Sequence, residues 1–144
     1  IVGKYNSVYI AMHMQGSPHN MKENSNCEDI TSELLSFFLD KINTCHLNKI
    51  NNVIIDPGFG FGKEIHQNFE ILKNLEIFQE LNVPILVGLS RKSMIYKSLK
   101  IESIDALNGT SVLNTVALLK KANILRVHDV KEAKESIELC KKLV

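Results

Sequence analysis

Short apolar runs rich in β-branched residues alternate with longer amphipathic stretches along this chain of 144 residues, and this alternation constrains the fold more than any other feature. The runs span residues 8–12, 53–55, 85–87 and 124–125. The last three runs are apolar at successive positions, as in strands whose two faces are both buried in a parallel sheet. We therefore predict four strands at these positions.

The stretches that follow the runs predict helices. Residues 30–45, 71–81, 112–122 and 130–144 carry apolar side chains at helical spacing. A short helix is also expected over residues 94–99, and Asp129 followed by Glu132 resembles a capping box for the last helix. Strands and helices in this order predict a parallel sheet with helical crossovers, an α/β fold.

Two architectures of this class compete. One is a doubly wound open sheet, and the other is part of a (β/α)8 TIM barrel, whose full length is typically about 250 residues. Residues 1–144 contain no linker or composition break, so we expect a single domain, and four βα units would supply about half of such a barrel. Because the chain opens at Ile1 rather than Met, we expect it to be a fragment or a processed piece.

Composition excludes several classes of function. The 17 basic and 16 acidic residues leave a net charge of +1, which is too small for nucleic acid to be the main partner. No apolar run approaches the roughly 20 residues of a membrane span, and no signal segment opens the chain. Cys27, Cys45 and Cys140 are odd in number and widely spaced, which predicts packing residues on helices and a cytoplasmic protein.

Polar, aromatic or glycine-rich segments follow all four predicted strands at their carboxyl ends. These segments are residues 12–18, 56–63, 88–93 and 126–129. Ligands of parallel α/β proteins bind at the carboxyl ends of the strands, so we expect the four segments to surround one site. His13, near the first strand, is more simply explained as a packed core histidine than as a ligand.

The second segment combines a carboxylate with alternating glycine and phenylalanine. Asp56 ends an apolar strand, so its carboxylate needs donors, either from a planar ligand edge with two adjacent N–H groups or from a turn that it caps. The G-x-G-x-G spacing of residues 58–62 matches neither a Walker loop nor a dinucleotide fingerprint. We expect either exposed aromatic rings that cover a flat ligand or a tight turn with one Phe in the core.

Both arginines of the chain lie in the last two segments. Residues 90–93, Ser-Arg-Lys-Ser, place two cations and two hydroxyls before a helix, where they either bind a carboxylate or phosphate or are simply solvated. Arg126 interrupts an apolar strand and is expected to be partly buried, with His128 on the same side of the strand. The pair predicts a cradle for a diphosphate, and a salt bridge of Arg126 with Asp56 or Asp129 is the alternative.

The four segments together resemble the dihydropteroate synthase family, in order and over the whole chain. The matching motifs are Met12-His13-Met14-Gln15-Gly16, Asp56-Pro57-Gly58-Phe59-Gly60-Phe61-Gly62-Lys63, Gly88-Leu89-Ser90-Arg91-Lys92-Ser93 and Arg126-Val127-His128-Asp129-Val130. The resemblance implies a (β/α)8 barrel of folate synthesis of which this chain supplies strands five to eight. The implied reaction condenses a pterin methyl diphosphate with para-aminobenzoate and releases diphosphate.

The resemblance also implies a role for each matching residue. Asp56 would hold the amino-pyrimidine edge of the pterin, and Lys92 would bond the oxygen and nitrogen side of the ring. Met14 and Gly88 would line the ring pocket. Arg126 would stack on the pterin and meet the diphosphate.

The remaining implied roles concern the other substrate and the leaving group. His128 would bind the diphosphate, which makes Lys92, Arg126 and His128 the catalytic residues. Phe61 and Ser93 would contact the para-aminobenzoate. The resemblance further implies a homodimer and Mg²⁺, whose ligands are expected from the absent first half and from the diphosphate, with no metal ligand in this chain.

Two other functions remain open at this point. The first is a pterin-binding barrel of the methyltetrahydrofolate type, which delivers a methyl group to a corrinoid. The second is a non-catalytic half-barrel that binds only its complementary half or itself. The cations at residues 91–92 and the Arg126–His128 pair favour a site that releases diphosphate.

Overall fold

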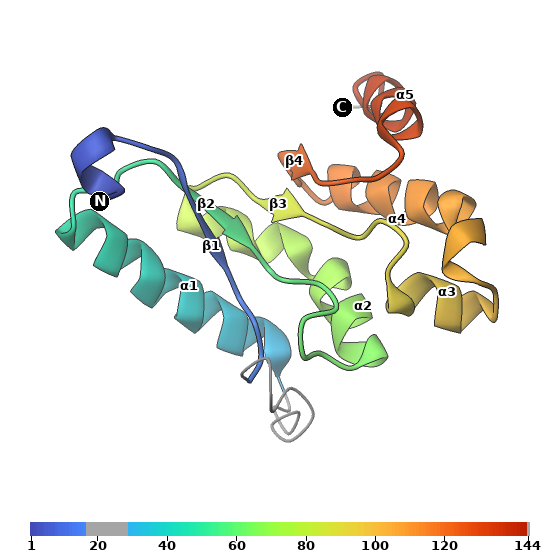
Figure 1. Cartoon of the computed structure of the whole chain (residues 1–144), viewed down its shortest axis with the longest axis horizontal. Coiled ribbons are helices and arrows are strands. Elements are labelled where there is room, and N and C mark those ends of the chain that lie inside the picture. The colour runs from blue at the N-terminus through green and yellow to red at the C-terminus, as the bar shows by residue number, and fades with distance from the viewer. Residues whose placement is uncertain (17–28, 144) are drawn as a thin grey trace.

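The computed structural model describes residues 1–16 and 29–143, whose strands run parallel to one another (Figure 1). Strand β1 (Tyr9–Met12) pairs with β2 (Val53–Asp56), and β3 (Leu86–Val87) pairs with β4 (Ile124–Leu125). A bridge between Ile55 and Ile85 joins the two pairs, so the strands follow one another in chain order. Sequential parallel strands with intervening helices are the arrangement of a barrel segment, as the sequence predicts.

Helices follow each of the strands and lie outside them. They are α1 (Ile30–Leu47), α2 (Ile65–Lys73), α3 (Ser93–Leu99), α4 (Leu107–Leu119) and α5 (Val130–Cys140). Shorter 3₁₀ turns cover Gly3–Tyr5, Leu75–Leu81 and Ser103–Asp105. In Figure 1 the strands pass through the middle of the molecule, with α1 at one end and α4 and α5 at the other. None of the helices within the described ranges combines the length and the hydropathy that a membrane span requires.

The hydrophobic core lies between the helices and one face of the strands. Ile55 on β2, Phe38 on α1 and Phe78 in the following 3₁₀ turn are fully buried. The rings of Phe38 and Phe78 meet edge to face, with centroids 6.0 Å apart. This geometry is favoured by the ring quadrupoles and adds to the burial of apolar area.

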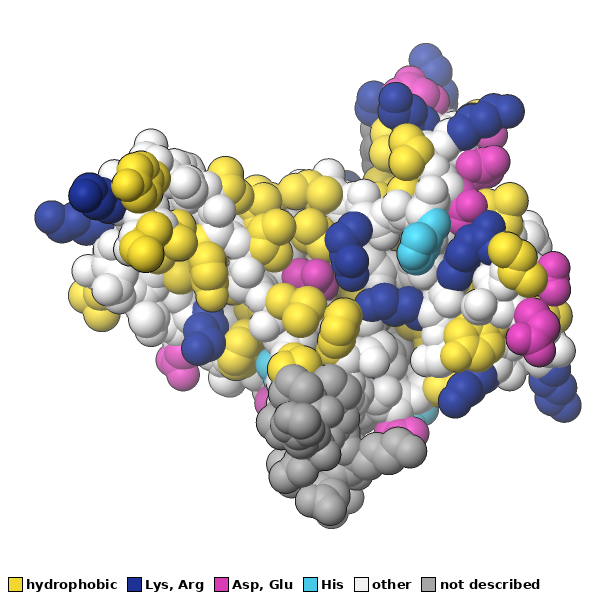
Figure 2. All heavy atoms as spheres, viewed as in Figure 1, with side chains coloured by type: hydrophobic (Ala, Val, Ile, Leu, Met, Phe, Trp, Pro, Cys, Tyr) yellow, Lys and Arg dark blue, Asp and Glu magenta, His cyan; other side chains and the backbone are white. Residues whose placement is uncertain are grey.

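The opposite face of the strands is more exposed than the sequence predicts. Ile10 and Met12 on β1 and Ile124 on β4 are exposed, so the expectation that the last strand is buried on both faces is wrong for this chain. Helices cover one face of these strands, whereas the other face lines the interior of a complete barrel. Figure 2 shows apolar side chains gathered over this part of the molecule.

Several predicted helix boundaries also need correction. The second helix begins at Ile65 and ends at Lys73, and the rest of its apolar stripe continues as a 3₁₀ turn to Leu81. The fourth helix already begins at Leu107, ahead of the predicted residue 112. The last helix has no side-chain cap from Asp129, because that carboxylate binds Arg91 instead. Cys45 and Cys140 are buried free thiols in helices, as predicted, whereas Cys27 lies outside the described residues.

Candidate functional site

The strand register places three of the predicted site positions on one face. The bridge between Ile55 and Ile85 puts Asp56 in register with Leu86, and Leu86 pairs with Ile124. Gly88 follows Leu86 by two residues, and Arg126 follows Ile124 by two residues. Side chains alternate along a strand, so Asp56, Gly88 and Arg126 all point away from the helix-covered face. We use the term rim for the carboxyl ends of the strands together with the segments that follow them. Figure 2 shows acidic, basic and histidine side chains close together beside the apolar patch.

The glycine-rich segment after β2 is a tight turn packed against the segment after β1. Gly58, Gly60 and Gly62 all have positive φ, between 68° and 78°, which glycine adopts without strain. A Cβ at Gly58 would lie 1.9 Å from the carbonyl oxygen of His13, so a side chain there is excluded. Phe59 is fully buried and Phe61 is half-buried. The turn with one Phe in the core is therefore the correct interpretation, with Phe61 left at the rim.

Asp56 is buried and already serves the turn with one of its oxygens. Its Oδ1 accepts a hydrogen bond of 2.8 Å from the backbone N–H of Gly58. Only 5% of the residue is exposed, so the carboxylate sits where a ligand N–H would meet little competition from water. The cap and the ligand contact, posed as alternatives from the sequence, are compatible because a carboxylate has two oxygens.

Lys92 brings an ammonium group to the centre of the rim. Its Nζ lies 4.6 Å from the ring centroid of Phe61 and donates a hydrogen bond to the carbonyl of Phe59. Burial, with a smaller effect of the charge of Arg126, lowers the pKa of Lys92 to about 8, although Asp56 favours the charged form. A half-buried ammonium between an aromatic face and a carboxylate is suited to bind the oxygen or nitrogen of a flat polar ring.

Lys63 has a structural role that the sequence reasoning missed. Its Nζ donates to the carbonyl oxygens of His13, Gly58 and Phe61 at 3.3, 3.1 and 3.4 Å. Burial lowers its pKa to about 8, although Asp56 and Glu33 favour the charged form. The signal in the sequence was a single lysine directly after three alternating glycines, whose turn exposes carbonyl groups that need a donor.

His13 is a core residue, as the sequence reasoning favoured. It is buried and meets the ring of Phe37 edge to face at 4.8 Å. Its Nε2 lies 3.5 Å from a carboxylate oxygen of Glu33. Burial and the charge of Lys63 nevertheless lower its pKa to about 4, which keeps the imidazole neutral at physiological pH.

The segments after β3 and β4 form a small polar hollow of about 70 Å³. Ser90 Oγ and His128 Nδ1 lie 2.8 Å apart, and the backbone N–H of His128 donates to the same hydroxyl at 3.2 Å. A Cβ at Gly88 would lie 3.2 Å from Nε and NH2 of Arg126, so the absence of a side chain lets the guanidinium cross this residue. The hollow is lined by Gly88, Ser90, Lys92, Arg126, Val127 and His128.

Arg126 departs from its predicted environment in two ways. It is exposed rather than partly buried, and within the described part of the chain β4 pairs only with β3. Among the described residues it forms no ion pair, and Asp129, one proposed partner, binds Arg91. The salt-bridge alternative for Arg126 is therefore wrong here, and its charge faces the hollow.

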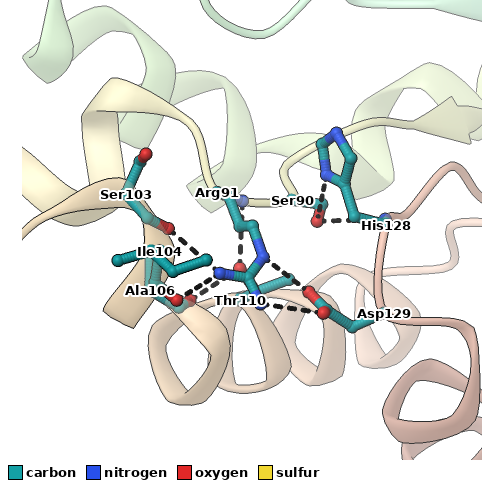
Figure 3. A network of polar contacts seen from close by, with 8 residues as sticks. All are labelled: Ser90, Arg91, Ser103, Ile104, Ala106, Thr110, His128 and Asp129. Carbon is teal, nitrogen blue, oxygen red and sulfur yellow. Dashed lines mark hydrogen bonds and ion pairs between the residues drawn. The ribbon is translucent and has the colours of Figure 1, made fainter.

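The predicted cluster of cations at residues 90–93 is divided by the structure. Lys92 and Ser90 line the hollow, whereas Arg91 turns away and makes a bidentate ion pair with Asp129 at 2.8 and 2.9 Å (Figure 3). Ser93 is half-buried as the first residue of α3. Met14 is half-buried in the segment after β1. Asp56, Lys92, Gly88 and Arg126 are thus brought together, while Arg91 is removed from the anion-binding group.

The acidic and imidazole groups of the described residues do not assemble a metal site. Within residues 1–16 and 29–143, no three or more His, Cys, Asp or Glu side chains lie close enough to hold an ion. The carboxylate at the rim, Asp56, is accompanied by the ammonium groups of Lys63 and Lys92, which oppose a bound cation.

The fold and the rim define a class of protein, a part of a (β/α)8 barrel with charged and polar groups gathered at the carboxyl ends of its strands. The chain belongs to the pterin binding enzyme family, whose model matches residues 1–128. Over 130 residues, the chain is 39% identical to dihydropteroate synthase of Escherichia coli K12. The matched region covers 89% of this chain and 46% of that protein, so the chain spans about half the length of this relative.

Solved structures agree with this assignment of fold and family. Dihydropteroate synthase of Yersinia pestis in a sulfonamide drug complex superposes with a TM-score of 0.94 at 34% identity, over 98% of this chain and 52% of that one. The Thermus thermophilus enzyme in complex with 4-aminobenzoate also gives 0.94, at 28% identity, over 99% of this chain and 59% of that one. These neighbours support the barrel over the doubly wound sheet, and this chain matches part of one.

Proposed function

We propose that this chain is the pterin- and diphosphate-binding part of a dihydropteroate synthase. The complete protein would condense 6-hydroxymethyl-7,8-dihydropterin diphosphate with para-aminobenzoate to give 7,8-dihydropteroate and diphosphate. The observation that carries the proposal is the single rim shared by a buried carboxylate, a half-buried ammonium and a guanidinium without an ion pair among the described residues, at Asp56, Lys92 and Arg126. The Thermus thermophilus neighbour in complex with 6HMPPP supports it.

The pterin would bind over the strand ends of β2 and β3. The carboxylate of Asp56 would accept N–H groups from the amino-pyrimidine edge, and the ammonium of Lys92 would donate to the ring oxygen and nitrogen. Met14 and Gly88 would line the ring, and the guanidinium of Arg126 would stack on its face.

The diphosphate would occupy the hollow between the segments after β3 and β4. Arg126 and His128 would bind it, and the charge of Lys92 lies beside them. In the reaction the aniline nitrogen attacks the pterin methylene carbon, the C–O bond to diphosphate breaks, and the nitrogen then loses a proton. Stabilising the departing anion and holding both substrates in line are the main contributions that such a site makes.

The para-aminobenzoate would lie near Phe61 and Ser93. Phe61 is half-buried at the rim and already carries the Lys92 ammonium on its face, while Ser93 begins the next helix. The neighbour bound to 4-aminobenzoate supports this assignment, and the neighbour bound to a sulfonamide drug suggests inhibition by that class.

Mg²⁺ is proposed as a cofactor whose protein ligands lie outside this chain. The described residues do not form a site for it, so it would be held by the diphosphate and by residues of the remaining half. The homodimer and the cytoplasmic location stay predictions. The methyl-transfer alternative is less well supported, because such a site has no leaving diphosphate to match the Arg126–His128 hollow.

Diphosphate release that depends on para-aminobenzoate, measured on the complete polypeptide containing this chain, tests the proposal. We expect Arg126→Ala to reduce turnover by at least tenfold with little change in melting temperature, since this exposed side chain makes no ion pair with the described residues. Lys73→Ala, which removes one exposed positive charge at the end of α2, is the matched control. Absence of release from the folded wild-type protein would refute the transferase.

A further inference from the structure

We propose that Arg91 is a positioning residue whose guanidinium joins the segment after β3 to the segment after β4 and thereby sets the spacing of Lys92 and His128. This inference rests on the proposed function, since the group that needs the spacing is the diphosphate. Arg91 itself does not line the hollow, so it would act through its neighbours.

The contact between Arg91 and Asp129 is geometrically specific. Nε donates to Oδ2 at 2.9 Å and NH2 donates to Oδ1 at 2.8 Å, which is the parallel fork that arginine makes with a carboxylate (Figure 3). The two side chains are about four-fifths buried, with 21% and 19% exposed. A lysine has no planar fork and could not reproduce both bonds.

A second contact runs parallel to the first, one residue earlier in each segment. Ser90 is joined to His128 through Nδ1 at 2.8 Å and through the backbone N–H at 3.2 Å. The backbone bond from Arg126 N–H to the carbonyl of Val87 lies just before both. Side chains therefore continue the joining of these two segments beyond the end of the β3–β4 ladder.

Arg91 is also fixed by α4 and by the 3₁₀ turn that precedes it. Its backbone N–H donates to Oγ1 of Thr110 at 3.0 Å, and NH1 donates to the carbonyls of Ser103 and Ile104. The φ of Arg91 is 55°, a left-handed conformation that a residue other than glycine keeps only where its surroundings enforce it. Loss of the guanidinium would free this torsion, and Lys92 is the next residue along the chain.

The ion pair also explains why the cap of α5 is missing. Asp129 stands at the N-cap position of that helix but uses both oxygens for Arg91. The hydrogen bonds from Arg91 hold the pKa of Asp129 below its usual range, so the pair stays ionised at neutral pH. A helix cap has been exchanged for a connection between two segments, which is understandable if their spacing matters for function.

Inorganic diphosphate, titrated calorimetrically into the protein, is the probe for the first test. We expect Arg91→Ala and Asp129→Asn each to weaken its affinity roughly tenfold, as for a misplacement of about half an ångström. The double variant should bind diphosphate no more weakly than either single variant, because the two substitutions remove the same contact. Lys120→Ala, which removes the 2.7 Å ion pair with Glu76, is the control and should bind like the wild type.

The second measurement is the NMR signal of the His128 ring, which does not depend on activity. We expect it to shift in Arg91→Ala and in Asp129→Asn but to stay in place in Lys120→Ala. Unchanged affinity together with an unchanged ring signal in the two folded variants would overturn the positioning role. A wild-type protein that binds no diphosphate would count against the proposed function, and the ring signal would then decide the positioning role alone. If Arg91→Ala does not fold, Asp129→Asn carries both tests.

Discussion

Substitution of Gly88 by alanine should damage the proposed diphosphate site without damaging the fold. The new Cβ would lie 3.2 Å from Nε and NH2 of Arg126 and 3.5 Å from Cζ, whereas ordinary contacts lie at about 3.5–4.0 Å. The guanidinium must therefore retreat by roughly 0.5 Å. A misplacement of about 1 Å can cost a hundredfold, so this shift should cost about tenfold, or about 1.4 kcal/mol of binding free energy.

The fold should tolerate this change because the crowded atoms end a flexible side chain. The φ of Gly88 lies outside the left-handed region, so alanine should stabilise the folded protein by about 0.4–1 kcal/mol through the unfolded state. Gly3→Ala is the opposite control, since its Cβ would lie 2.4 Å from the carbonyl oxygen of Asn48, away from the rim.

Titration calorimetry with inorganic diphosphate and urea unfolding together test the Gly88 prediction. We expect Gly88→Ala to bind about tenfold more weakly at equal or greater stability, and Gly3→Ala to lose stability while its affinity is kept. Full affinity in Gly88→Ala would refute the reasoning that Arg126 must cross Gly88 to reach the anion.

Three further predictions concern the two phenylalanines of the glycine-rich turn, Lys92 and Lys121. Phe59→Ala should lower the free energy of unfolding by about 3–5 kcal/mol, because Phe59 is fully buried. Phe61→Ala should change it by less than about 1 kcal/mol and weaken para-aminobenzoate binding, because Phe61 is only half-buried. Equal losses of stability for the two variants in urea unfolding would contradict this prediction. Lys92 has a pKa of about 8 in the folded protein and therefore loses its proton at a lower pH than in the unfolded chain. The free energy of unfolding should consequently rise between about pH 8 and 10.5, while the affinity for the pterin falls. Lys92→Met should flatten the pH dependence of both quantities. Lys121 follows α4 with a φ of 71°, a conformation that glycine adopts without strain. Lys121→Gly should therefore raise the free energy of unfolding in urea by about 0.5 kcal/mol. A decrease instead would show that the Lys121 side chain makes a compensating contact.

Local patterns predicted most of the elements that carry the rim. The runs at 53–55 and 85–87 became β2 and β3 within one residue, since apolar β-branched runs between turn residues are a local signal. The second helix was placed too late and too long, because an apolar stripe does not distinguish an α-helix from a 3₁₀ turn that buries the same residues. The exposure of β4 could not be predicted, because burial depends on what covers a strand.

The sequence alone determined which residues stand at the strand ends, because the alternation of the chain fixes the strands and their carboxyl ends lie at one edge of a parallel sheet. Only the tertiary structure decided what those residues do. Arg91 and Arg126 are both rim arginines in the sequence, yet one is bound by Asp129, 38 residues away, and the other faces the hollow. Ion-pair partners this distant are chosen by how the segments pack, and no local pattern records that choice.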